Sequence, residues 1–152
     1  MDPRVLDEQL ARWEELELEQ ARGLAELAAR ARSPLARAVL SAAARDSEKH
    51  AELYSLARQL LAGGASGGPE LEAPLEALRR HVDVELDAMK FLESAAGDPG
   101  LGPALRFVLK LILRDERLHH VLLYDLYQAL VRGALGGEEA FRELYEDLDR
   151  AI

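Results

Sequence analysis

The chain of 152 residues contains no cysteine. This absence excludes disulfide bonds, thiolate catalysis, iron–sulfur clusters and cysteine-ligated zinc sites. Aromatic residues make up only 5% of the chain, and no segment is rich in valine, isoleucine and threonine, as the strands of a sheet protein would be. The residues that dominate instead are alanine, leucine, glutamate and arginine, which are good helix formers. The composition therefore predicts an all-α protein.

Basic charge and long apolar runs are also scarce. Lys and Arg total 19 against 28 Asp and Glu, so the net charge is −9 and a basic face for nucleic acid is not expected. No apolar run approaches the ~20 residues that a membrane span requires. The first residues, Met1-Asp2-Pro3-Arg4, are not typical of a signal peptide. We therefore expect no nucleic-acid or membrane partner and a cytoplasmic location.

Turn residues divide the chain into segments with helical apolar spacing. The length suits a single domain over residues 1–152. Breaks are predicted at Ser33-Pro34, in the Gly-rich segment 63–69, at 97–100 and at Gly136-Gly137. We expect helices over residues 2–31, 34–61, 74–96 and 103–132, followed by a short fifth helix over 138–150.

The chain repeats itself weakly. Residues 45–50, Arg-Asp-Ser-Glu-Lys-His, align with residues 114–119, Arg-Asp-Glu-Arg-Leu-His. Sliding the first helix onto the third places Glu17 on Glu85. The two predicted helix pairs therefore look like copies of one hairpin, each with an acid on its first helix and a histidine on its second.

Each of these polar residues interrupts an apolar stripe. Glu116 and His119 are three residues apart and share a helix face, and His50 lies among apolar residues in the same way. Charged groups on such faces are costly unless they are paired or bind a metal. Glu17 and His50 lie at nearly equal distances from their turn, as do Glu85 and His119, so each hairpin brings an acid and a histidine to one height.

The length of the central linker bears on the topology. If the two hairpins face each other across a twofold axis, the second and third helices run parallel. The connection over residues 62–73 must then cover about 34 Å. Twelve extended residues reach at most about 40 Å. We therefore expect a lengthwise crossover between these two helices.

These residues resemble the ferritin-like superfamily, which includes ferritins and rubrerythrins. Its pattern is Glu on the first helix, Glu-x-x-His on the second, Glu on the third and Glu-x-x-His on the fourth. Five of the six positions match, namely Glu17, His50, Glu85, Glu116 and His119, and the sixth is Ser47. The absence of cysteine excludes the rubredoxin-like module of rubrerythrins.

The resemblance implies a four-helix bundle that oxidises ferrous iron or reduces peroxide or dioxygen. It implies two iron ions, with manganese or zinc as alternatives. His50 and His119 would each bind one ion, Glu17 and Glu85 would be terminal ligands, and Glu116 would bridge. Serine is a poor bridging ligand, so we expect Ser47 to weaken the second ion, and a glutamate at that position to restore it.

Other residues complete the expected site. Asp46 and His81 are candidates to replace the missing glutamate, and Asp46 or Asp115 would orient a histidine. We expect a homodimer or a larger homo-oligomer. The alternative is a non-enzymatic helical bundle with a degenerate or single metal site that acts as a dimeric or partner-binding module, in which each of these polar residues is structural.

Overall fold

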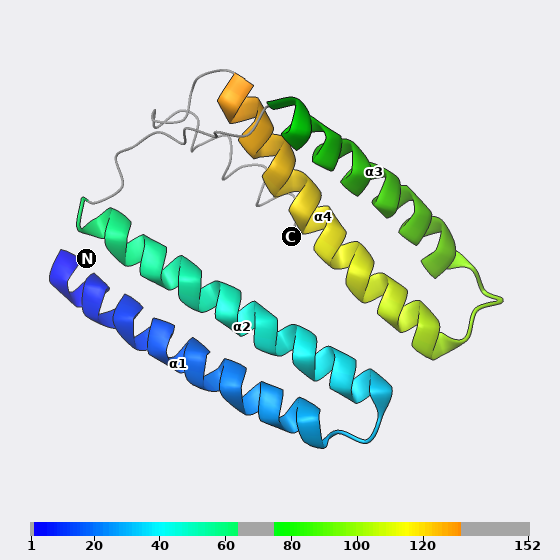
Figure 1. Ribbon diagram of the computed structural model, residues 1–152, viewed down its shortest axis with the longest axis horizontal. Helices are drawn as coiled ribbons and strands as arrows, with labels where there is room; N and C mark the ends of the chain where they lie inside the picture. The colour runs from blue at the N-terminus through cyan, green and yellow to red at the C-terminus, as the bar shows by residue number, and fades with distance from the viewer. Residues whose placement is uncertain (1, 64–74, 132–152) are drawn as a thin grey trace. The chain divides into compact units, whose positions relative to one another are not determined.

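The computed structural model describes residues 2–63 and 75–131, and the regular structure in this part of the chain is entirely helical. The four helices are α1 (Pro3–Arg30), α2 (Pro34–Leu61), α3 (Leu75–Gly97) and α4 (Pro103–Val131), as Figure 1 shows. The all-α prediction is confirmed. The fifth helix predicted over residues 138–150 lies outside the described residues, as does most of the predicted crossover.

The turn between α1 and α2 is fixed by the residues that predicted it. The Ser33 side chain caps α2 by accepting a hydrogen bond from the Ala36 amide at 3.3 Å, and Pro34 occupies the first helical position. From within α2, Arg37 Nη2 donates to the carbonyl oxygen of Ala31 at 3.0 Å. Because helix ends leave backbone groups without partners, these bonds stabilise the turn.

The turn between α3 and α4 is built in a similar way. Asp98 Oδ1 accepts from the Gly100 amide at 2.8 Å, as expected of an aspartate in a tight turn. Arg106 Nε, in the first turn of α4, donates to the Ala96 carbonyl oxygen near the end of α3 at 3.1 Å. Local polar contacts therefore close both connections.

The helices form two compact units, one containing α1 and α2 and the other α3 and α4. We call them the N-terminal hairpin and the C-terminal hairpin; in each, two antiparallel helices lie side by side (Figure 1). The residues buried between the two helices of a hairpin form its seam. In the N-terminal hairpin the buried seam residues are all small: Ala21, Ala28, Ala44, Ser47 and Ala51. In the C-terminal hairpin they include the larger Val82, Leu92 and Leu113.

Each hairpin carries apolar side chains outside its seam. On α2, Leu53 and Leu60 are exposed and follow His50 at helical spacing, forming the N-terminal stripe. On α4, Ile112 and Leu122 are exposed on either side of His119, forming the C-terminal stripe. Each stripe is an apolar surface that its own hairpin leaves uncovered.

Trp13 lies outside the packed residues of α1. It is 53% exposed, because the seam follows Leu10, Glu14, Glu17 and Ala21 and passes beside it. Among the described residues, no helix is long and apolar enough to cross a membrane.

Candidate metal centre

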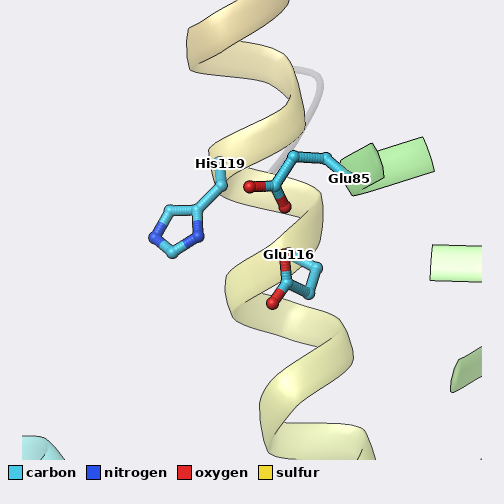
Figure 2. Close-up of side chains that lie close together, drawn as sticks. All are labelled: Glu85, Glu116 and His119. Carbon is cyan, nitrogen blue, oxygen red and sulfur yellow. The ribbon is translucent and has the colours of Figure 1, made fainter. Parts of the chain in front are cut away.

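Three potential metal ligands meet on the C-terminal hairpin. Glu85 extends from α3 toward α4, where it meets Glu116 and His119 (Figure 2). One ligand atom from each of the three residues lies within 4.8 Å of the other two. We call Glu85, Glu116 and His119 the triad. It was predicted from helix rise and spacing, because residues three apart on α4 share a face and Glu85 lies at the same height on the antiparallel α3.

The triad spans the edge of the seam. The side chains of Glu85 and Glu116 are half-buried, whereas His119 is exposed on the C-terminal stripe. In Figure 2 the carboxyl group of Glu85 approaches both the carboxyl group of Glu116 and the imidazole ring of His119. The two carboxyl groups are therefore shielded from solvent more than the imidazole is.

The carboxyl groups of Glu85 and Glu116 interact with each other electrostatically. A hydrogen bond with Glu85 raises the pKa of Glu116 above its ordinary value; burial and repulsion from the Glu85 carboxylate raise it further, and His119 lowers it. Two carboxyl groups can share a hydrogen bond only if one keeps a proton. Glu85 Oε2 is also buried without a hydrogen-bond partner among the described residues.

A divalent cation fits this arrangement. It would supply the missing partner for Glu85 Oε2 and compensate two neighbouring negative charges. Ligand atoms bound at about 2.1 Å lie about 3 Å apart when cis and about 4 Å apart when trans, so donors within 4.8 Å need only small side-chain shifts. Two carboxylates and one imidazole suit iron, manganese or zinc.

The N-terminal hairpin brings together the other predicted pair. His50 Nδ1 lies 3.5 Å from Glu17 Oε1, and Glu17 is the more buried of the two side chains. The repeat therefore places an acid beside a histidine in both hairpins. The two sites differ in donor number, since among the described residues the triad is the group in which three such ligands meet.

Ser47 occupies the position that corresponds to Glu116 in the repeat. It is only 4% exposed and lies in the alanine-rich seam. Of the predicted auxiliary residues, Asp46 accepts a hydrogen bond from Lys49 Nζ at 2.8 Å on the surface, while His81 and Asp115 are exposed. None of them belongs to the triad.

Sequence reasoning missed one polar network. Glu14, on α1, is half-buried and accepts a hydrogen bond from Arg58 Nη1 at 3.1 Å. Arg58 Nε donates to Asp7 Oδ1 at 2.9 Å, and these bonds raise the pKa of Arg58. A usable signal was the spacing of Asp7, Glu14 and Ala21, which recur every seven residues on one helix face.

Two polar residues of α4 also lie in protected positions. Asp125 is 6% exposed, although it stands in an apolar run of the sequence. His120 stacks on Tyr124 with ring centroids 6.2 Å apart, and its Nδ1 atom is buried without a hydrogen-bond partner among the described residues.

No protein-family model, curated protein or solved structure matches the chain.

Proposed function

We propose that this chain is a metal-binding protein of ferritin-like design whose principal site is the triad. The observation that carries the proposal is the convergence of three donor atoms within 4.8 Å of one another on two helices of one hairpin. The buried, unpartnered Oε2 atom of Glu85 supports it, because such an atom requires a proton, a water or a cation.

The apolar stripes support the ferritin-like design. A helix face that is apolar and exposed requires a partner surface, and both stripes contain the histidine that the family pattern assigns to metal binding. We propose that the hairpins pack stripe against stripe as a four-helix bundle, with the linker crossing it lengthwise. His50 and His119 would then face inward, and Glu17 with His50 would offer a second, weaker metal position.

The proposed activity is oxidation of ferrous iron or reduction of peroxide or dioxygen. A bound iron or manganese ion would supply the electron transfer. Around it, Glu85 and Glu116 would compensate the charge of the ion, and His119 would bind as neutral imidazole. The pKa of Glu116 is raised by its hydrogen bond with Glu85, by burial and by repulsion, so a cation bound at this carboxylate would compete with a proton there.

Metal binding tests the proposal directly. Protein purified without chelator should contain iron or manganese, and metal-free protein should bind ferrous iron under anaerobic conditions in a calorimetric titration. Glu116→Ala should abolish tight binding, whereas Glu15→Ala, an exposed glutamate on α1, should leave binding unchanged. Binding that survives Glu116→Ala would contradict the site.

A second candidate function follows from Ser47. A serine stands here in place of the glutamate that would bridge two ions, and it is buried in the seam. The missing carboxylate favours a non-enzymatic bundle with one structural metal. Oxygen consumption after addition of ferrous iron separates the two functions. An enzyme consumes oxygen over repeated additions, and a structural site binds one ion without oxidising further iron.

A further inference from the structure

The seams of the two hairpins satisfy their charges differently. In the N-terminal hairpin each acid at the seam has a cationic or imidazole partner: Arg58 contacts Asp7 and Glu14 at 2.9 and 3.1 Å, and His50 lies 3.5 Å from Glu17. The small residues Ala21, Ala28, Ala44, Ser47 and Ala51 fill the rest of this seam. Asp7 and Glu14 therefore need no added ion to compensate their charge, and Glu17 faces an imidazole rather than a second carboxylate.

The seam of the C-terminal hairpin is not compensated in this way. Glu85 on α3 faces Glu116 on α4, and Glu85 Oε2 is buried without a partner among the described residues. The triad imidazole, His119, is exposed at the edge of the site. Like charges on facing helices oppose the packing of those helices, and the cost grows with their burial.

We infer that the C-terminal hairpin is the metal-dependent half of this protein: one divalent ion held by Glu85, Glu116 and His119 joins α3 to α4, while α1 and α2 pack independently of metal. The inference rests on the proposed function and extends it, because metal binding then controls whether the C-terminal hairpin is well ordered. If the ion binds only the folded hairpin and not the unfolded chain, the free energy of binding adds to the stability of the folded hairpin.

Ser47 strengthens the assignment. At the position equivalent to Glu116 the N-terminal hairpin carries a small hydroxyl in a closely packed seam, so this position brings no second carboxylate to face Glu17. The Glu17–His50 pair offers two donors that already face each other. The first ion therefore binds without residues of the N-terminal hairpin.

Hydrogen exchange of the full chain, read by mass spectrometry with and without Mn²⁺, tests this inference. One equivalent of Mn²⁺ per chain should slow exchange of the central amides of α3 and α4 about tenfold or more, and should change α1 and α2 less than twofold. Calorimetry on the same samples should give one tightly bound ion per chain. The matched variants are Glu116→Gln in the C-terminal hairpin and Glu17→Gln in the N-terminal hairpin.

Glu116→Gln should abolish the Mn²⁺-induced protection and, because it removes the repulsion, should slow exchange of α3 and α4 in the metal-free protein. Glu17→Gln should leave the affinity for the first ion within threefold. Equal protection of both hairpins, or a tenfold loss of affinity in Glu17→Gln, would overturn the inference while metal binding itself stands. Absence of binding in the calorimeter would instead refute the proposed function.

Discussion

At the scale of single residues, the burial of Ser47 changes what a substitution there should do. Viewed from the sequence, a glutamate at position 47 completes the ligand pattern. In the structure Ser47 is 4% exposed and packed among alanines, so a larger charged side chain must separate α1 from α2 to reach solvent. A glutamate, which stands at the equivalent position 116 of the C-terminal hairpin, therefore has no room at position 47 of the N-terminal hairpin.

We expect Ser47→Glu to lower the stability of the metal-free protein by about 2 kcal/mol or more, the usual cost of overpacking combined with a buried charge. Ser47→Ala should change it by less than about 1 kcal/mol, because alanine fits the same seam. Urea denaturation followed by circular dichroism measures both. A Ser47→Glu variant that is as stable as the parent and binds two ions would show that this seam opens readily.

Glu116 gives a pH dependence whose sign follows from its environment. Its ordinary pKa is 4.5, and in the folded protein the pKa is raised by the hydrogen bond with Glu85, by burial and by repulsion. The folded state therefore binds the proton more tightly than the unfolded chain. The stability that Glu116 contributes is complete below pH 4.5 and is lost as pH rises through the folded pKa.

We therefore expect the stability of metal-free Glu116→Gln, relative to the parent, to increase as pH rises above 4.5 and to level off above the folded pKa. Thermal melts in chelator between pH 5 and 8 provide the comparison, and Glu52→Gln, at an exposed position on α2, is the control. A stability difference between Glu116→Gln and the parent that stays constant across this range would mean that Glu116 is not perturbed by Glu85. Because a metal ion and a proton compete for the Glu116 carboxylate, the affinity for metal should increase as pH rises.

At the scale of helices, the two hairpins show how far local sequence determines structure. The helix limits predicted as 2–31, 34–61, 74–96 and 103–132 agree closely with α1 to α4, because caps and Gly/Pro turns are local signals. The pairing of Glu17 with His50, and of Glu85 with Glu116 and His119, followed from the constant rise of helices on either side of a turn.

The roles of Glu14 and Ser47 could not be predicted in the same way. Adjacent residues on a helix differ by about 100° in direction, so the choice of Glu14 rather than Glu15 for the seam depends on the rotation of α1 against α2. That rotation is set by close packing of alanines from both helices, a contact between residues far apart in the chain. Trp13, although apolar, lies outside that seam and is exposed.

Arg58 should stabilise the N-terminal hairpin through its two acidic partners on α1. We expect Arg58→Met, which keeps much of the apolar stem, to lower the melting temperature modestly, and the difference from the parent to shrink at high salt because the ion pairs are partly exposed. Arg45→Met, at an exposed position on the same helix, is the control. A loss that persists unchanged in 1 M salt would point to packing of the side chain rather than charge.

At the scale of the whole molecule, the apolar stripes define a test of bundle assembly. Leu122 on the C-terminal stripe and Leu18 on another face of α1 are 43% and 42% exposed. If the stripes pack against each other, Leu122→Glu should cost about 2 kcal/mol or more of stability. Leu18→Glu should stay within about 0.5 kcal/mol, as is usual for surface positions. Equal effects of the two substitutions, measured by urea denaturation, would argue against packing of the stripes.

The alanine seam has a consequence for how this protein tolerates mutation. Between α1 and α2 the effect of a seam substitution on stability depends mainly on side-chain volume, because the seam is filled by small residues that leave no space for a larger side chain: Ala21, Ala28, Ala44 and Ala51. Between α3 and α4, near the triad, the effect of a substitution depends mainly on its charge, because Glu85 and Glu116 already face each other. The two halves share one repeat but thus differ in which substitutions they accept: at the seam of the first a new side chain must stay small, and near the triad of the second it must preserve the balance of charge.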